Sequence, residues 1–255
     1  MTAHVRLKDV SFSYPIYGLT NRSLKVTVMR QLVGGQLAMD DRKVIVNALR
    51  NISCSLEPGD RLGLIGPNGS GKTTLLRMLA GLAHPSSGGL DIQGRVIPLI
   101  DKGLGIHSEL TGAQNIELPL RLLGASDAEV RAAQEEIPGW TGLGHFLDLP
   151  VRTYSEGMRA RLLFAICTAL QGDILILDEW LGAGDAQFAA AAEARLHSYL
   201  NRTKIIVFAT HSMDLLRRFC TKVAWLEQGE LVMMGDVEDV LGAYCERMFP
   251  TLAAE

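Results

Sequence analysis

The feature that most constrains the fold of this 255-residue chain is a glycine-rich segment between an apolar run and a stretch with helical spacing. The apolar run, 61–65, predicts a buried strand, and 73–82 predicts a helix. The segment between them fits the pattern G-x-x-x-x-G-K-[ST], and its residues are Gly66, Pro67, Asn68, Gly69, Ser70, Gly71, Lys72 and Thr73. A strand, a glycine turn and a helix in this order indicate an α/β core.

The same segment predicts a phosphate site. Glycines let the backbone curl so that several N–H groups point at phosphate oxygens, and the following helix presents its positive end to the same anion. We expect Lys72 to contact the β- and γ-phosphates, Thr73 to ligate Mg²⁺ and Thr74 to complete the binding set. The pattern indicates nucleotide binding but does not choose among the many families that carry it.

A second motif is an apolar run, 174–177, that ends in Asp178 and Glu179. We expect Asp178, at the carboxyl end of a strand, to hold Mg²⁺ directly or through water. Glu179 lies one residue further and is placed to orient or deprotonate the attacking water. Phosphoryl transfer needs little beyond positioning and charge neutralisation, so two adjacent acids with separate duties suffice.

The rest of the chain alternates between strand and helix patterns. Strands are predicted at 5–14, 48–56 and 205–208, and an amphipathic helix at 236–248. Between the core strands, Ser126-x-x-Glu129 predicts the start of a helix, Pro138-Gly139 its end, and Ser155 the start of another. Together these patterns predict a helical sub-domain inserted into the α/β core.

The interval 16–47 is a long insertion before the next core strand. Leu24, Val28 and Leu32 have helical spacing within it. Two interpretations remain open: a surface helix packed on the domain, or a contact with a membrane protein or lipid headgroups.

Composition excludes several classes of protein. Hydrophobic residues make up 47% of the chain, the net charge is −3 and the pI is about 6.1, which is typical of a globular protein and not of a general nucleic-acid binder. We expect no signal peptide, because residues 1–6 do not start an apolar segment. We expect a soluble chain, because no run of about 18 apolar residues is present. The four cysteines lack metal-ligand spacing, so reduced thiols in a cytosolic setting are expected.

The segment Tyr154-Ser155-Glu156-Gly157-Met158-Arg159 resembles the signature loop of ABC ATPases, usually written LSGGQ. The phosphate loop, the helical insertion, the acidic pair and His211 follow the order of that family, so the resemblance covers nearly the whole chain. It implies a P-loop NTPase core of ABC type with an antiparallel β subdomain and an inserted helical subdomain. It further implies one domain over 1–255, with the core at 1–104 and 171–255 and the helices at about 105–170.

The resemblance also assigns roles in the site. It implies a homodimer in which Ser155 and Gly157 of one subunit contact the γ-phosphate of ATP held by the other. Asp185 would link the two sites, and His211 would contact the γ-phosphate and help to hold the water. Tyr14 matches the aromatic residue that stacks on adenine, with Tyr17 as the alternative. The catalytic set is then Glu179, His211 and Lys72.

Departures from the general family pattern indicate which subfamily the chain resembles. The loop 103–112 has no glutamine where the family places one, and His107 is the nearest match. Met158 replaces the final glutamine of the signature, and Trp180 follows the acidic pair. The pattern Y-S-x-G-M-x-x-R-L over 154–162 is similar to that of ATPases which export bacterial O-antigen, capsule or teichoic acid.

This resemblance implies a Mg²⁺-dependent ATPase, peripheral at the cytoplasmic face of the bacterial cytoplasmic membrane. Its expected partners are an integral-membrane permease and, through the permease, a lipid-linked glycan; no nucleic acid is expected. Three alternatives remain: an ABC ATPase for drug or lipid export, a soluble ABC ATPase without a transport role, and a nucleotide-gated scaffold without turnover. The scaffold would predict loss of Glu179 or His211, and both are present.

Overall fold

The computed structural model describes residues 2–17, 37–40, 43–100, 105–178 and 186–248. The chain forms two compact units. The first consists of Met1–Gly94 and Val207–Glu255, and the second of Arg95–Ile206.

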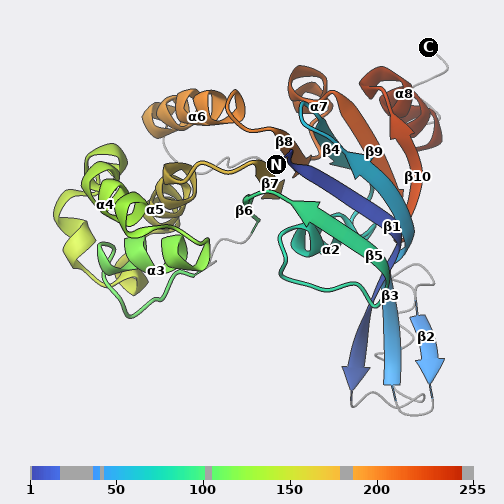
Figure 1. Ribbon diagram of the computed structural model, residues 1–255, viewed down its shortest axis with the longest axis horizontal. Helices are drawn as coiled ribbons and strands as arrows, with labels where there is room; N and C mark the ends of the chain where they lie inside the picture. The colour runs from blue at the N-terminus through green and yellow to red at the C-terminus, as the bar shows by residue number, and fades with distance from the viewer. Residues whose placement is uncertain (1, 18–36, 41–42, 101–104, 179–185, 249–255) are drawn as a thin grey trace. The chain divides into compact units, whose positions relative to one another are not determined.

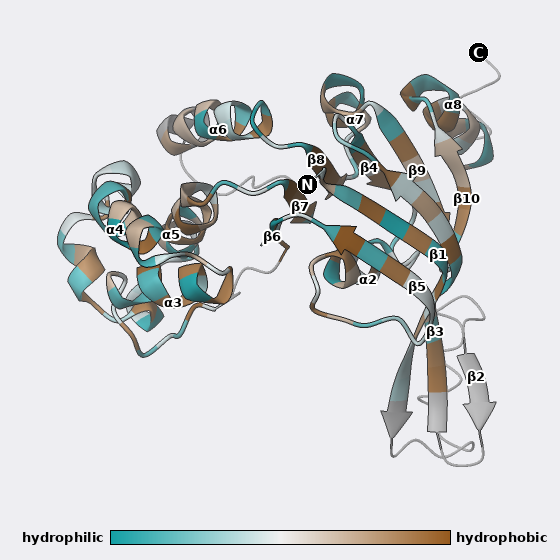
Figure 2. Ribbon diagram, viewed as in Figure 1, coloured by the Kyte–Doolittle hydropathy of each residue, from teal (hydrophilic) through white to brown (hydrophobic). Residues whose placement is uncertain are grey.

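The first unit contains an antiparallel sheet, as the sequence predicted. Its strands, in the order β2-β3-β1-β5, are β2 (Leu37–Asp40), β3 (Lys43–Leu56), β1 (His4–Tyr17) and β5 (Ser87–Gln93). Along β1, Val5 and Leu7 are buried whereas Arg6 and Lys8 are exposed, which is the alternation of a sheet with one solvated face. Figure 2 shows this alternation as changing colours along β1.

The boundaries predicted for β1 and β3 were wrong. β1 continues three residues past Tyr14, and β3 begins at Lys43 instead of Ala48. The two strands stay paired along this extension, with Ile16 opposite Val44 (Figure 1). The reason is that 44–46 is a run of β-branched residues, which favours a strand. The predicted helical spacing of Leu24, Val28 and Leu32 lies outside the described residues.

Four consecutive strands of a second sheet belong to the first unit, in the order β10-β9-β4-β8. These strands are β4 (Arg61–Ile65), β9 (Lys222–Glu227), β10 (Glu230–Gly235) and the end of β8 (Ile205–Ala209), and the helices of the unit are α2 (Lys72–Leu79), α7 (Met213–Phe219) and α8 (Val237–Met248). β4 and β9 are parallel, and β8 is buried throughout. Continuous burial confirms the prediction made from the apolar runs at 61–65 and 205–208.

The second unit holds most of the helices. It contains β6 (Val96–Leu99), β7 (Ile174–Asp178) and the start of β8, together with α3 (Gln114–Leu122), α4 (Asp127–Thr141), α5 (Glu156–Ala169), α6 (Ala186–Leu200) and the short 3₁₀ helices η1 (Gly144–Asp148) and η2 (Val151–Thr153). The strands β6 and β7 are parallel. No strand was predicted at β5 or β6, because glycine and proline interrupt the apolar pattern there.

The start of α4 was predicted correctly and its end was not. Ser126 Oγ accepts a hydrogen bond from Glu129 N, and Glu129 accepts one in return from Ser126 N, as a capping box requires. The helix passes through Pro138 and ends at Thr141, and its C-cap Gly142 has a left-handed φ of 63°. Burial of Ile137 and Thr141 on one face holds this last turn in place despite the proline.

The four cysteines are free thiols, as their spacing predicted. Burial raises the pKa of Cys54 to about 11 and those of Cys167 and Cys220 to about 12. Cys245 Sγ lies 3.7 Å from Met213 Sδ, between α8 and α7.

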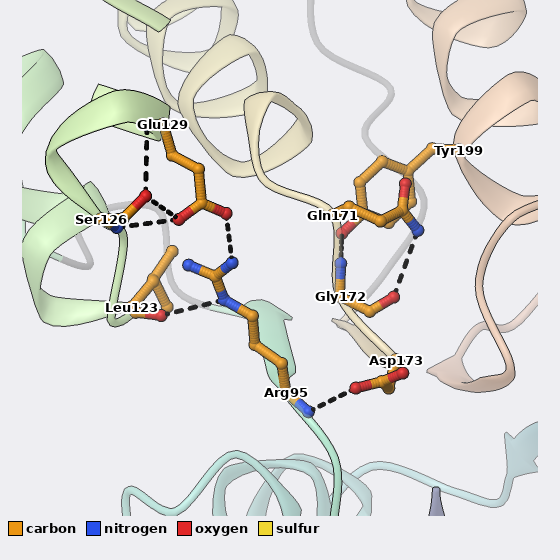
Figure 3. A network of polar contacts seen from close by, with 8 residues as sticks. All are labelled: Arg95, Leu123, Ser126, Glu129, Gln171, Gly172, Asp173 and Tyr199. Atoms are coloured by element: carbon orange, nitrogen blue, oxygen red, sulfur yellow. Dashed lines mark hydrogen bonds and ion pairs between the residues drawn. The ribbon is translucent and has the colours of Figure 1, made fainter. Parts of the chain in front are cut away.

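Arg95 joins the start of β7 to the start of α4 (Figure 3). Its backbone N donates to Asp173 Oδ2 at 2.9 Å, and its carbonyl oxygen accepts from Asp173 N at 2.8 Å. Its guanidinium group reaches Glu129 Oε1 at 2.6 Å and Leu123 O at 3.4 Å. The hydrogen bond from Arg95, with those from Ser126, lowers the pKa of the Glu129 carboxyl group to about 2.

We predict that Glu129→Gln lowers the free energy of unfolding at pH 7 by ~1 kcal/mol or less, because the carboxylate is partly exposed. The pKa is lower in the folded state than its ordinary value of 4.5, so the stabilisation is complete above about pH 4.5 and is lost as the pH falls towards 2. Urea unfolding at pH 7 and at pH 3 measures both effects.

The matched control is Glu135→Gln, on an exposed position of the same helix. We expect the Glu129→Gln protein to lose less stability on acidification than the wild type and the control do. An identical acid loss in all three proteins would contradict a stabilising contact between Arg95 and Glu129.

Candidate nucleotide site

The glycine-rich segment 66–71 connects β4 to α2 in a shape that requires glycine at two positions. Gly66 has a φ of 148° and Gly71 a φ of 105°, both in the left-handed region. A Cβ atom at Gly66 would lie 2.0 Å from Leu226 O, and one at Gly71 would lie 2.7 Å from Ala48 O. The backbones of β9 and β3 therefore leave no room for side chains here.

Two sources of positive charge lie at this loop. Lys72 Nζ donates to Gly66 O at 2.7 Å and to Pro67 O at 3.1 Å, so the ammonium group lies against the inside of the loop. Lys72 also starts α2, whose N-cap Gly71 offers no side-chain acceptor and whose first turn has no acidic residue. The positive end of the helix and the ammonium group together favour an anion.

Ser70 supports the same interpretation. Its side chain is 2% exposed, and Oγ has no hydrogen-bond partner among the residues that the structure describes. A buried hydroxyl group without a partner is costly, so this position fits a ligand that supplies one. The loop as a whole thus fits the phosphate groups that the sequence predicted.

One element that holds the loop was missed by the sequence analysis. The turn Gln228-Gly229, between β9 and β10, donates a hydrogen bond from Gly229 N to Ser70 O at 3.0 Å. Gly229 O in turn accepts from Arg50 N of β3 at 2.7 Å. Both turn residues have positive φ. A residue followed by glycine between two strand patterns is a sequence signal for a hairpin, so the turn could have been predicted. Its contact with the phosphate loop could not.

His211 lies directly beyond the strand next to β4. Thr210 N donates to Leu64 O at 3.4 Å, so the end of β8 lies beside the end of β4, one residue before the phosphate loop begins. His211 itself is exposed, and Ser212 after it caps α7 by accepting from Leu215 N. The structure therefore brings the predicted histidine to the same edge of the sheet as Gly66.

The register of β1 favours Tyr14 over Tyr17 as the adenine-stacking residue. Tyr14 lies opposite Val46, two residues from Ala48, whose carbonyl oxygen approaches Gly71. Tyr17 lies opposite Lys43, five residues from Ala48. The side chain of Tyr14 is 40% exposed, and a ring exposed to this extent can stack on a base.

Three further predicted residues lie in the second unit. Asp178 ends β7 and is half-buried after four buried apolar residues. Ser155 is the N-cap of α5, where its Oγ accepts from Met158 N at 3.2 Å, and Gly157 lies in the first turn. Glu179 and Asp185, predicted to act in hydrolysis and in the link between two sites, lie outside the described residues.

The described part of the chain contains no group of three or more His, Cys, Asp or Glu side chains that could hold a metal ion. Such a cage is not needed for Mg²⁺, which keeps several waters and usually takes one or two protein ligands together with substrate phosphates. The hydroxyl group of Thr73, exposed in the first turn of α2, and the carboxylate of Asp178 are oxygen donors of this kind. The donor chemistry therefore fits the ion. None of the described helices is long and apolar enough to cross a bilayer.

The sequence profile of the ABC transporter family matches residues 49–182, more than half of the chain. The chain belongs to the ABC transporter family. The matched region includes the phosphate loop, the signature segment and the acidic pair, so the resemblance stated from those motifs is confirmed.

Named relatives of this ABC protein include several ATP-binding proteins of export systems. The O-antigen export system ATP-binding protein RfbE of Yersinia enterocolitica is 43% identical over 223 residues, which cover 87% of this chain and 93% of RfbE. An O-antigen export system ATP-binding protein RfbB of Klebsiella pneumoniae is 35% identical over 96% of this chain and 98% of RfbB. The teichoic acids export ATP-binding protein TagH of Staphylococcus haemolyticus is 34% identical over 96% of this chain and 89% of TagH.

Solved structures show the same fold. A dimeric ATP-binding cassette in a post-hydrolysis state, bound to ADP and Pi, matches with a TM-score of 0.67 over 91% of this chain and 98% of that one. At 21% identity, this likeness confirms the ABC-type fold of the chain.

We predict that Gly71→Ala weakens ATP binding by roughly tenfold or more, because a non-glycine residue at this φ costs about 1–3 kcal/mol and its Cβ would press on Ala48 O. Titration with a fluorescent ATP analogue, together with thermal unfolding, measures the effect. Gly89→Ala is the control, because a Cβ there meets nothing within 4 Å. Equal affinities of the two variants would contradict the shape argument for the loop.

Proposed function

We propose that this chain is the ATP-hydrolysing subunit of an ABC transporter that exports a lipid-linked polysaccharide, such as O-antigen, capsule or teichoic acid, across the bacterial cytoplasmic membrane. The observation that carries the proposal is the 43% identity with an O-antigen export ATP-binding protein over 93% of its length. The departures at His107 and Met158 support the same subfamily.

We assign the binding of ATP to the first unit. The backbone N–H groups of the loop and the start of α2 hold the phosphates, with contributions from Gly66, Pro67, Asn68, Gly69, Ser70, Gly71, Lys72, Thr73 and Thr74. Lys72 neutralises charge on the β- and γ-phosphates. Tyr14 stacks on adenine, and this contact favours a purine without distinguishing one purine from another.

Hydrolysis requires a water molecule placed opposite the bond between the γ-phosphorus and its bridging oxygen. In this proposal Glu179 orients that water and accepts its proton as the new phosphorus–oxygen bond forms and the bridging bond breaks, giving ADP and Pi. His211 contacts the γ-phosphate and helps to hold the water. Thr73 and Asp178 would hold Mg²⁺, and the ion would offset the negative charge of the phosphate groups.

The signature segment acts on the nucleotide of the partner subunit. Ser155 is suited to this role because its hydroxyl oxygen accepts from Met158 N and leaves its single proton for a phosphate oxygen. The start of α5 and the backbone of Gly157 add the positive end of a helix. Asp185 links the two sites, so ATP binding closes the homodimer and hydrolysis reopens it.

The remaining parts of the proposal concern the assembly. We propose a core at 1–104 and 171–255 with a helical sub-domain at about 105–170, all within one ATPase domain. The subunit would be peripheral at the cytoplasmic face of the membrane, where an integral-membrane permease carries the glycan. The homology to export subunits supports a permease partner.

Replacement of Glu179 tests the catalytic assignment. We predict that Glu179→Gln retains ATP binding, lowers kcat by about 10²-fold or more, as loss of a general base does, and accumulates an ATP-bound dimer. Phosphate release and light scattering in the presence of ATP measure the two effects. Hydrolysis at the wild-type rate in this variant would remove Glu179 from the mechanism.

Purification from the native membrane tests the transport assignment. We expect the chain to co-purify in mild detergent with a permease, and cells lacking the chain to accumulate lipid-linked glycan on the cytoplasmic side. Wild-type chain should relieve the accumulation, and Glu179→Gln should not. Recovery from the soluble fraction without a membrane partner would favour the non-transport ATPase, and accumulation of a different lipid would favour the drug or lipid exporter.

A further inference from the structure

The segment that leads into Ser155 is hydrogen-bonded to the loop that carries His107. The pairing includes a β-bridge between Thr111 and Pro150. Its backbone hydrogen bonds run from Arg152 N to Ser108 O at 2.9 Å, from Val151 N to Leu110 O at 2.9 Å, from Gly112 N to Leu149 O at 3.2 Å and from Ala113 N to Leu147 O at 2.9 Å. An ion pair between Arg152 and Glu109 lies on the same pairing. The two segments, 107–113 and 147–154, thus form one ladder.

The side chain of Asn115 forms hydrogen bonds with the backbone of the first of these segments, 107–113. Its side chain is fully buried. Oδ1 accepts from His107 N at 2.7 Å, and Nδ2 donates to His107 O, Leu110 O and Thr111 O at 3.0, 3.1 and 2.9 Å. Only a side chain that carries both an acceptor and donors can satisfy this set, because aspartate lacks the donors.

Tyr154 ends the second segment, 147–154, and directly precedes Ser155 of the signature. Its side chain is 4% exposed, and Oη donates to Phe146 O at 2.6 Å. A Cβ atom at Gly112 would lie 2.1 Å from this Oη. Gly112 is not in the left-handed region, so its backbone does not require glycine. The glycine is therefore needed for space: the tyrosine hydroxyl group occupies the volume that a side chain at 112 would fill.

We propose that Tyr154, Gly112 and Asn115 are positioning residues, which we call the signature clasp. The clasp holds Ser155 at a fixed offset from the loop of His107, so that the two loops move as one body. This inference rests on the proposed function, in which Ser155 serves the site of the partner subunit. The clasp thereby links the His107 loop of one subunit to ATP turnover in the other.

A mixed dimer separates this role from a general effect on folding. One subunit carries Glu179→Gln and does not hydrolyse ATP. Turnover then occurs only in the other subunit, which we call the hydrolysing subunit. In the proposed dimer, the signature segment that contacts the ATP of the hydrolysing subunit belongs to the Glu179→Gln subunit. We expect Gly112→Ala to lower kcat roughly tenfold when it is placed in the Glu179→Gln subunit. The same change in the hydrolysing subunit should alter kcat by less than about twofold, and ADP affinity should not change in either case.

A compensation test follows from the 2.1 Å contact. Tyr154→Phe removes Oη, so Gly112→Ala should cost less in that background, and the double variant should be more active than Gly112→Ala alone. The controls are Gly139→Ala, where a Cβ meets nothing within 4 Å, and Tyr199→Phe, which loses a hydroxyl hydrogen bond with Gly172 N elsewhere in the same unit. If Gly112→Ala does not fold, Tyr154→Phe and Asn115→Asp are placed in the same two arrangements.

Each outcome decides a different point. Equal losses in both arrangements, or no compensation in the double variant, would overturn the clasp and leave only a folding role. Ser155→Arg in the Glu179→Gln subunit tests the underlying function separately. If Ser155→Arg leaves kcat of the hydrolysing subunit unchanged, the proposal that the signature acts on the partner's site is wrong. If Ser155→Arg lowers kcat but Gly112→Ala has the same effect in both arrangements, only the proposal of the clasp is wrong.

Discussion

The first unit depends on the close approach of two carbonyl oxygens to two glycines. Leu226 O of β9 and Ala48 O of β3 lie where side chains at Gly66 and Gly71 would otherwise extend. One contact comes from the strand parallel to β4 and the other from the antiparallel sheet, so the phosphate loop is shaped by both sheets of the unit. The turn at Gly229 completes the arrangement by bonding the loop to β3. The loop is therefore built by tertiary contacts, although its sequence is local.

The second unit is organised by polar contacts on buried side chains. Asn115 satisfies backbone groups of the loop 107–111, and Tyr154 satisfies the carbonyl oxygen of Phe146 in η1. The half-buried Arg95 connects β7 to α4, because its backbone N donates to the Asp173 side chain and its guanidinium group donates to Leu123 O. Buried polar groups of this kind are costly when any member is removed, so they specify one arrangement of the loops more strongly than apolar packing would. Segments that carry Asp178 and Ser155 are thereby held to defined neighbours.

The sequence predicted those features that local patterns encode. Continuous apolar runs identified β4, β7 and β8, and the spacing of Ser126 and Glu129 identified the start of α4. The errors arose where distant contacts decide the outcome. The extension of β3 depends on pairing with β1, and α4 continues past Pro138 because Ile137 and Thr141 are buried. No local pattern predicted that position 112 needs glycine for space, because the side chain that fills this space belongs to a residue 42 positions away. The roles of Glu179 and Asp185 remain predictions.

The thiols of this chain have a consequence for labelling chemistry. Thiolate is the form that reacts with maleimides and peroxide, and at pH 7.5 a thiol whose pKa is about 11 or 12 is ionised to a negligible extent. Their raised pKa values therefore lower the reactivity of Cys54, Cys167 and Cys220 towards these reagents. A cysteine introduced on the surface would react in preference to these three. Cys167, which is buried, could then stay in place, and its loss would leave a cavity in the core.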